Sequence, residues 1–583
     1  MQRSHAAAAV VVKIADKCEL QTEEVVSMNP LTTLTNGTKA TFLVTLTFSS
    51  FASVAVFIWS LNDPGFFRNA TLSIGQVACF VFVFSAGFAA LGAIALSLYQ
   101  MYTCNIDFHA AMSRYLPDDS RQQLFAAAEL SIYLTLFFVC DRTDFVSRQK
   151  KHYDRDFFWF IWALLCLAGL ATLQKAKPPK PGDLIKGDDG KDDAPEKHDA
   201  DDFHVKHLQR DQTEEWKGWM QVMFLWYHYF EAKELYNAIR LYIAAYVWMT
   251  GFGNFSYYYM KKDFSLERFL AMQWRLNFLV FWICAMLQNE YMLYYICMLH
   301  TTFTVIIYAG LGIKHEWNHS SVGICGKFAA VTIFALVVWD VPGVFDVVWK
   351  PLTFLVGYHD PEKTTRPVLQ EWQFRSHLDH LVWIFGMFCA YNHPRVDSWL
   401  VKLDALPRLQ SWGIKLLVSM LTIVGLYLYV DKVFSLDKFA YNALHPYTSF
   451  IPIAGYCILR NIFKRVRMYH LHLFEFLGKV TLETYIAQFH IWMSTTGING
   501  SPKKLLRFLP DNWPMVNFLL MSGICLYVSF RLFHVTNTLK QTVLPSKSSR
   551  AVLYRNLLWS AVGGLAVYTW ASMLKTLASS YMN

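Results

Sequence analysis

Polar side chains recur at helical spacing along one strongly apolar segment, residues 211–231. Steps of three or four residues keep to one face of a helix, and the remaining positions are mostly Trp, Met, Val, Leu and Tyr. A bilayer disfavours such polar groups by several kcal/mol unless they meet a partner or an aqueous pocket. A histidine with a pKa near neutrality suits proton abstraction in such a pocket. The predicted stripe consists of Lys217, Gln221, Phe224, His228 and Glu231.

A second apolar segment, GKVTLETYIAQFHIW, carries a similar stripe. Helical spacing predicts that Lys479, Glu483, Ile486 and His490 share one face. Two helices that each turn charged groups and a histidine inward can share a pocket within a bundle. The alternative is that each histidine is a hydrogen-bonded packing residue, which is the commoner role of a lone membrane histidine.

Several basic residues lie outside these stripes. Arg240 and Arg275 flank a segment with Gly251 and Asn254, and each arginine is either a lipid-headgroup anchor or a ligand for phosphate. Arg375 and Asp379 have the spacing of a helical ion pair. His300 ends an apolar run, which is typical of a helix cap or of a pocket residue, and His445 precedes a proline, as a turn element or a ligand.

The elements that must position these residues are membrane helices. The 583-residue chain is 54% hydrophobic and 17% charged, whereas soluble proteins carry about 25% charge. Apolar runs recur along its whole length, and the length needed to cross a bilayer predicts roughly a dozen or more passes. The predicted fold is an all-α polytopic membrane bundle. The net charge of +9 is typical of basic flanks of membrane helices, and the scattered cysteines without a CxxC pair indicate neither a metal centre nor a disulfide framework.

Composition predicts five parts along the chain. A charge-rich stretch of Lys, Asp, Pro and Gly has almost nothing to bury and predicts a disordered linker. The sequon Asn69–Ala70–Thr71 would be a glycosylation site if its loop faces a lumen. The parts are a polar tail (1–40), a four-span membrane unit (41–174), the linker (175–210), a membrane core (211–545) and a C-terminal membrane helix (546–583).

Long strings of unusual composition resemble one family of membrane O-acetyltransferases. EWKGWMQVMFLWYHYFEAKELYNAIRLYIAAYVWMTGFGNFSYYY, WDVPGVFDVVWKPLTFLVGY, EWQFRSHLDHLVWIFGM and LGKVTLETYIAQFHIW are similar to the plant reduced-wall-acetylation proteins. Fungal capsule-polysaccharide and animal sialate O-acetyltransferases share that membrane domain. Those relatives also carry a lumenal Gly-Asp-Ser hydrolase-like domain, and this chain has no Gly-Asp-Ser. The resemblance therefore implies the plant type, in which a separate lumenal Gly-Asp-Ser protein is the partner.

The resemblance implies acetyl transfer from acetyl-coenzyme A (acetyl-CoA) to a glycan hydroxyl in a Golgi or other secretory-pathway membrane, with an acyltransferase-like membrane core and no metal. It points to His228 as the catalytic residue, either as a general base oriented by Glu483 or Glu231 or as a transient acetyl carrier, with His490 matching a late family histidine. An oxyanion donor could come from Asn254, Tyr227 or the backbone near Gly251. The implied donor-binding residues are Arg268, Arg275, Arg240, Lys217 and Asn254, assisted by Lys261 and Lys262.

Two other functions fit the same residues. Polar stripes inside a bundle also describe a solute pathway, so the chain could instead carry acetyl-CoA or another acetyl donor into the lumen for separate transferases. A scaffold for partner transferases is the third interpretation, and it predicts that substitutions in the stripes have little effect. The acceptor stays open among xylan, pectin, another glycan and a sialic acid.

Overall fold

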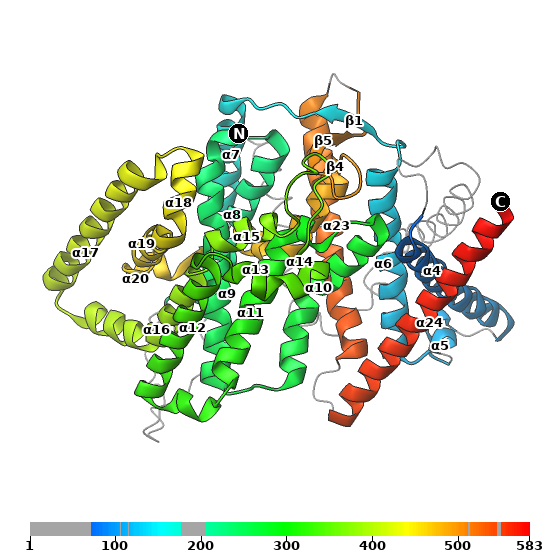
Figure 1. Cartoon of the computed structure of the whole chain (residues 1–583), viewed down its shortest axis with the longest axis horizontal. Helices are drawn as coiled ribbons and strands as arrows, with labels where there is room; N and C mark the ends of the chain where they lie inside the picture. The colour runs from blue at the N-terminus through cyan, green and yellow to red at the C-terminus, as the bar shows by residue number, and fades with distance from the viewer. Residues whose placement is uncertain are drawn as a thin grey trace.

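The computed structural model describes residues 72–104, 107–114, 116–176, 206–510, 513–544 and 550–582. The predicted tail, the first predicted span, the sequon and most of the charged linker lie outside these residues. Within them the chain is almost entirely helical, as predicted (Figure 1). Eight described helices are long and apolar enough to cross a membrane, fewer than the dozen expected from apolar runs.

The N-terminal part contributes long helices and two short strands. α4 and α6 pack against each other, and α7 follows a short strand. These elements are α4 (Ile74–Cys104), α5 (Phe108–Ser113), α6 (Asp118–Arg142), β1 (Ser147–Lys150), α7 (Arg155–Leu170) and β2 (Leu173–Lys175).

The central part runs from α8 to α16 and contains both the first polar stripe and a set of short helices. α8 and α9 are long enough to span a bilayer but are more polar than the eight spans. The elements are α8 (Arg210–Phe230), α9 (Tyr236–Lys261), α10 (Leu266–Leu287), α11 (Tyr295–Gly312), α12 (Ser321–Asp340), α13 (Val344–Trp349), α14 (Thr353–Val356), α15 (Gln370–Leu378) and α16 (Val382–Ala405).

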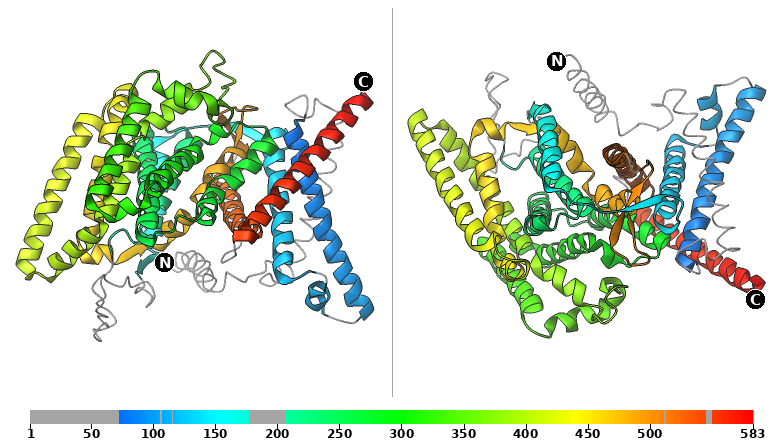
Figure 2. Two further views of the ribbon diagram at one scale, coloured as in Figure 1. Left: turned by 60° about the horizontal axis from the view of Figure 1, so that its bottom comes forward. Right: turned by 90° about the horizontal axis from the view of Figure 1, so that it is seen from above.

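The C-terminal part returns the chain to the N-terminal helices. α24 crosses α4, and α23 packs against α6 (Figures 1 and 2). The elements are α17 (Arg408–Tyr429), α18 (Lys438–Thr448), α19 (Phe450–Asn461), α20 (Lys464–Arg467), β3 (Tyr469–Leu471), α21 (His472–Lys479), α22 (Thr481–Ala487), a π-helix (Gln488–Trp492), β4 (Met493–Thr495), β5 (Pro502–Arg507), α23 (Pro514–Val543) and α24 (Arg550–Met582).

The short strands connect parts of the chain that are distant in sequence. β1 pairs antiparallel with β5, which also pairs with β4, and β2 pairs antiparallel with β3. One hydrophobic core extends from Cys79 on α4 to Val535 on α23. The predicted N-terminal unit and the predicted membrane core therefore share one interior, and the boundary between them stays a prediction.

Two helix pairs approach each other through reciprocal glycines. A Cβ on Gly218 of α8 would lie 1.8 Å from the carbonyl oxygen of Phe474, and one on Gly478 would lie 1.9 Å from the carbonyl oxygen of Glu214. Gly251 of α9 and Gly386 of α16 form an equivalent pair against Trp383 and Trp248. Small residues allow such close backbone contact between membrane helices, where van der Waals packing drives association.

Candidate active site

A cavity of about 410 Å³ lies between α8, α9, α10, α11 and the α21–α22 segment. Its polar lining consists of basic, amide and hydroxyl groups and one carboxylate, that of Glu214, and the rest is apolar. From Arg210 to Phe224, both of which line the cavity, α8 rises about 21 Å. The polar residues that line it are Arg210, Glu214, Lys217, Gln221, Tyr246, Thr250, Asn254, Arg275, His300, Thr304, Lys479, Thr481 and Tyr485.

The first part of the α8 stripe faces this cavity as the sequence predicted. Lys217 lines the cavity with its ammonium 2.6 Å from Glu214 Oε2. Gln221 donates to the Thr481 carbonyl and to Thr484 Oγ1, each at 3.1 Å, so α8 is fixed against α22. Tyr246 of α9 donates to the Lys217 carbonyl at 2.6 Å. These hydrogen bonds hold the stripe residues at one polar wall of the cavity.

The second stripe reaches the cavity in part. Lys479 lines it, and Glu483 is fully buried beside it in a bidentate ion pair with Arg275, in which Nη2 lies 2.9 Å from Oε2. The Arg275 guanidinium also lies 5.0 Å from the centre of the Phe533 ring. Arg275 is therefore held at the cavity wall, and Glu483 neutralises it rather than orienting a histidine.

Asn254 and His300 occupy the opposite wall. Asn254 donates to Thr304 Oγ1 at 3.1 Å, and His300 Nδ1 lies 2.6 Å from Thr250 Oγ1. His300 is the histidine among the residues that line the cavity. Of the two roles that the sequence left open for it, the structure selects the pocket residue. His300 and Thr304 are four residues apart on α11, and Thr250 and Asn254 are four residues apart on α9. This matched spacing is the sequence signal that could have linked His300 to Asn254.

His228 lies one helical turn beyond the cavity. Its ring is 4.7 Å from that of Phe224, which lines the cavity, and 6.1 Å from that of Phe489. The positive charges of Lys151, Arg375 and Arg240 act on the imidazole. We call His228 and these three cations the His228 cluster. Phe224 and Tyr485, with rings 5.9 Å apart, lie at the cavity end next to it.

The cations of the His228 cluster come from three different elements. Lys151, in the loop after β1, donates to the His228 carbonyl at 2.6 Å. Burial lowers the pKa of Lys151 from 10.5 to about 8, against the raising effect of Glu231. Arg375 of α15 donates to Glu371 at 2.7 Å and lies over the Tyr295 ring at 4.4 Å.

Arg240 of α9 differs from the other two cations in its pairing. It is 5% exposed, and Nε is 3.2 Å from the Tyr236 hydroxyl. Its Nη1 is buried and has no hydrogen-bond partner among the described residues. A buried guanidinium nitrogen without a partner is costly, so it marks a place where an anionic group would be stabilised.

Glu231 and His490 do not line the cavity, and Glu231 reaches the His228 cluster only through its charge on Lys151. Glu231 follows α8 with a positive φ of 60°, and its exposed side chain is 3.1 Å from Lys233 Nζ. Helical spacing does not extend to Glu231 because α8 ends at Phe230. His490 is fully buried, with Nδ1 3.2 Å from Asp141 Oδ2 and Nε2 2.6 Å from the Tyr294 hydroxyl. The π-helix that contains it adds a residue to the turn and rotates it off the predicted face.

Two further predictions about this region are wrong in their geometry. Arg375 pairs with Glu371 and not with Asp379, whose Oδ1 lies 3.7 Å from His445 Nε2. Gly251 lies in the middle of α9 at the contact with Trp383, where it serves helix packing. His445 is a fully buried residue of α18 with Nδ1 3.0 Å from the Tyr441 hydroxyl, not a turn element.

The remaining basic candidates lie at the cavity's α8 N-terminal end but do not line it. Arg268 packs over the Tyr257 ring at 3.9 Å, and Lys261 packs over the same ring at 5.3 Å. Hydrogen bonds from Ser265, followed by smaller effects that include Arg268, lower the pKa of nearby Asp263. α9 runs antiparallel to α8, since Tyr242 packs on Trp219 and Trp248 on Trp216. These cations therefore lie at the end opposite His228.

Comparison with known proteins is consistent with this architecture. The family model described as the 10 TM acyl transferase domain found in Cas1p matches residues 67–181 and 197–557. The N-acetylneuraminate (7)9-O-acetyltransferase of Danio rerio is 27% identical over 465 residues, which cover 76% of this chain and 54% of the relative. The chain thus spans about half the length of that curated relative. No solved structure matches the chain.

Proposed function

Because this chain belongs to the family of the 10 TM acyl transferase domain found in Cas1p, we propose that it is a multi-pass membrane O-acetyltransferase that moves acetyl from acetyl-CoA to a glycan hydroxyl. The observation that carries the proposal is the cavity, where basic residues and His300 line an elongated space that ends beside His228. The family confirms the resemblance seen in the sequence strings.

We propose that the anionic donor enters from the α8 N-terminal end. Arg210, Lys217, Arg275 and Lys479 line that cavity, and guanidinium groups suit phosphate because they stay charged and bind it bidentately. Lys217 and Arg275 are each paired with a carboxylate, Glu214 and Glu483 respectively. A phosphate group would compete with Glu214 and Glu483 for them.

We propose His228 as the general base at the opposite end. The acceptor hydroxyl oxygen bonds to the thioester carbonyl carbon while its proton passes to the imidazole; the C–S bond then breaks and the proton goes to the leaving thiolate. The developing oxyanion needs a donor that is already in place. Arg240 fits that role, since its buried Nη1 has no partner among the described residues.

Phe224 and Tyr485 lie between the cavity and His228, which favours separate binding places for the donor and the acceptor. The donor occupies the cavity, and the acceptor reaches the His228 cluster from the other side. The same arrangement accommodates an acetyl-imidazole, in which His228 accepts acetyl from the thioester and passes it to the hydroxyl. His300 lies on the donor side and is proposed to position the thioester through its Thr250 partner.

The acceptor and the cell compartment are part of the proposal. The name of the fish relative assigns N-acetylneuraminate to that protein; for this chain we propose polysaccharide hydroxyls in a Golgi or other secretory-pathway membrane. A lumenal protein of the Gly-Asp-Ser type is the proposed partner, as the resemblance to the plant proteins implies.

The test uses full-length protein purified in detergent with radiolabelled acetyl-CoA and a soluble glycan. An enzyme yields acetylated glycan without a closed compartment, whereas a transporter of the acetyl donor yields product only in sealed vesicles that also contain a transferase. His228→Ala should abolish product at unchanged protein abundance. Product formation at the wild-type rate by that variant would overturn the role of His228.

A further inference from the structure

Three groups of histidine and carboxylate side chains have their ligand atoms within 4.8 Å of one another in the described residues. They are not equivalent, because a cation is favoured where a buried imidazole nitrogen faces the carboxylate and has no hydrogen-bond partner of its own. Their hydrogen bonds distinguish them. The groups are His207, His393 and Asp397; His470, His472 and Glu475; and Asp340, His377 and His380.

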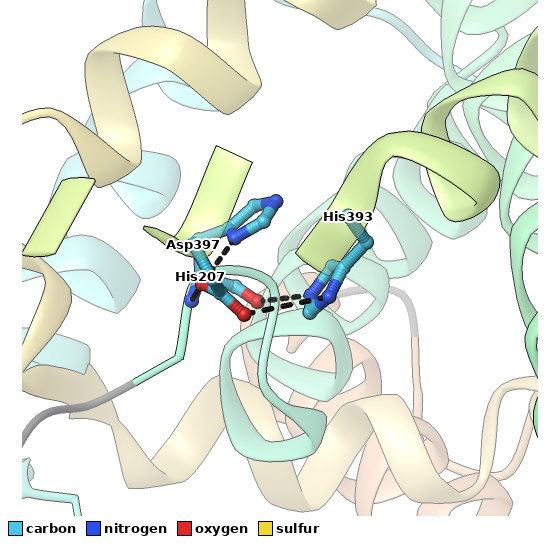
Figure 3. Close-up of side chains that lie close together, drawn as sticks. All are labelled: His207, His393 and Asp397. Carbon is cyan, nitrogen blue, oxygen red and sulfur yellow. Dashed lines mark hydrogen bonds and ion pairs between the residues drawn. The ribbon is translucent and has the colours of Figure 1, made fainter. Parts of the chain in front are cut away.

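The first group is closed by its own hydrogen bonds. In Figure 3 the His207 and His393 rings lie face to face, with centroids 4.0 Å apart. Asp397 Oδ1 lies 2.5 Å from His207 Nδ1 and accepts the His207 backbone N–H at 2.9 Å, while His393 Nε2 lies 2.9 Å from the His207 carbonyl. Stacked rings bonded in this way form a clamp at the start of α8.

The second group already contains a cation. Glu475 lies 2.7 Å from Lys479 Nζ, 3.1 Å from His470 Nε2 and 2.9 Å from His472 Nδ1. The ammonium pairs with Oε1 and repels a divalent ion, while Oε2, the oxygen that faces both histidines, is already hydrogen-bonded to His472 Nδ1.

The third group has an unused lone pair. His380 is fully buried at the junction of α15 and α16, and its Nδ1 lies 2.6 Å from the His377 carbonyl, which fixes the proton on Nδ1. Its Nε2 therefore presents a lone pair, and this atom is buried without a hydrogen-bond partner among the described residues. It points toward Asp340 Oδ1 at 3.5 Å. A lone pair facing a carboxylate oxygen is unfavourable unless a cation lies between them.

The other two ligand atoms lie at suitable distances. His377 Nε2 is 3.1 Å from Asp340 Oδ1, to which it is hydrogen-bonded. Zinc bonds of about 2.0–2.2 Å at tetrahedral angles place ligand atoms about 3.3–3.6 Å apart, so these two atoms would separate by a few tenths of an ångström when an ion replaces the hydrogen bond. A histidine that donates its second nitrogen to a backbone carbonyl is the usual outer support of a metal ligand, and His380 has that support. Asp340, at the exposed end of α12, leaves a path for the ion.

We propose that Asp340, His377 and His380 form a binding site for a divalent transition metal, with zinc as the best fit. Two imidazoles and one carboxylate favour zinc over magnesium or calcium, which prefer oxygen ligands. A fourth position remains for water beside Tyr447, whose hydroxyl donates to Asp340 Oδ1 at 3.0 Å. This site was not predicted from the sequence, because Asp340 is far from the two histidines along the chain and no cysteine contributes.

The metal would fix the end of α12 to α15, the helix that carries Arg375 of the His228 cluster. Without it, two hydrogen bonds join the same elements, from His377 to Asp340 and from Trp339 Nε1 to Ser376 Oγ at 2.8 Å. The site is thus outside the proposed acetyl-transfer centre and supports one of its cations.

The test measures zinc in the full-length protein purified in detergent with zinc supplied and excess removed. About one zinc per chain is expected, and cobalt substitution should give the visible absorption bands of a four-coordinate site. His377→Gln, at a partly exposed ligand that the fold tolerates best, should weaken zinc binding about tenfold or more. His380→Gln should do the same if the variant remains monodisperse in gel filtration.

His393→Gln is the matched control, because it removes one imidazole from the closed clamp in Figure 3. It should retain wild-type zinc content. Wild-type protein without bound zinc would overturn the proposal, and so would equal zinc loss in the His377→Gln and His393→Gln variants.

Discussion

The cavity and the His228 cluster both gather positive charge, but they balance it differently. In the cavity, Lys217 lies against Glu214 and Arg275 against Glu483. In the His228 cluster, Arg375 has Glu371, whereas Arg240 Nη1 is buried without a partner among the described residues. Removing one member of a buried pair costs about 3–5 kcal/mol, so the two regions must respond differently to substitution.

The paired cations of the cavity suit binding of an anion, whereas the unpaired nitrogen of Arg240 suits stabilisation of a charge that develops during the reaction. A paired cation can turn from its carboxylate to a phosphate, so that donor binding competes with an internal ion pair, which suits a donor that binds and leaves. A preorganised cation with an unused donor is strongest when negative charge develops next to it, and this effect lowers the barrier rather than KM.

The largest expected effect is that of His228→Ala. Removal of a general base typically lowers the rate about 10²–10⁴-fold, and kcat should fall with little change in the KM for acetyl-CoA. His300→Ala is the matched variant on the cavity side, and it should mainly raise that KM. Steady-state kinetics of both proteins decide the comparison, and the opposite pattern would exchange the roles of the two histidines.

The next effect is that of Arg240→Lys, which retains the charge but removes the planar fork. Loss of one oxyanion donor costs about 10²–10³-fold in kcat, and the lysine variant should approach the lower figure. Lys438 provides the control, since it lies over the same Tyr236 ring at 4.9 Å but is exposed. Lys438→Gln should leave kcat unchanged; an equal loss in both variants would contradict a role for Arg240 in the reaction.

Arg275→Met is expected to affect both donor binding and stability. The KM for acetyl-CoA should rise about tenfold, equivalent to about 1.4 kcal/mol, and the buried Glu483 carboxylate should lose its partner. Thermal unfolding should then show destabilisation of about 3–5 kcal/mol. Adding Glu483→Gln should restore the stability but not the KM. If the double variant also regains the wild-type KM, Arg275 serves only the fold.

The smallest effect concerns pH. Burial lowers the pKa of Lys151 to about 8, so the ammonium that bonds to the His228 carbonyl loses its charge above that pH. The transfer rate should fall as pH rises through about 8, and Lys151→Met should lack this inflection. Between about pH 8 and 10.5 the unfolded chain binds the proton and the native chain does not, so stability rises with pH. Because this group makes the protein more stable over that pH range, a fall in the transfer rate there cannot be attributed to unfolding caused by Lys151.

The sequence predicted the membrane helices and the first stripe because both depend on local spacing. Lys217 and Gln221 face the cavity as their three- and four-residue steps require. The first stripe fails at Glu231, where α8 has ended, and the second fails at His490, where a π-helix interrupts the period. Neither a helix end nor an extra residue in a turn is encoded by apolar periodicity alone.

The contacts between distant segments could not be read from spacing. Lys151 reaches His228 from the loop after β1, and Asp340 lies near His380 although α13, α14 and α15 separate them along the chain. Arg375 has the spacing of a pair with both Glu371 and Asp379, and tertiary packing selects Glu371. The charges in a stripe were predictable, but their partners depend on where other helices cross.

The crossing of α8 with α21 restricts how the donor can enter. Gly218 and Gly478 place the two backbones in direct contact, so these cavity walls have no layer of side chains that could slide apart. Space for a bulky nucleotide must then arise by rotation of long, flexible basic side chains at the mouth. Donor binding would accordingly tolerate small changes in the shape of the donor. A single methyl group added at Gly218 or Gly478 would instead push α8 and α21 apart and distort the cavity.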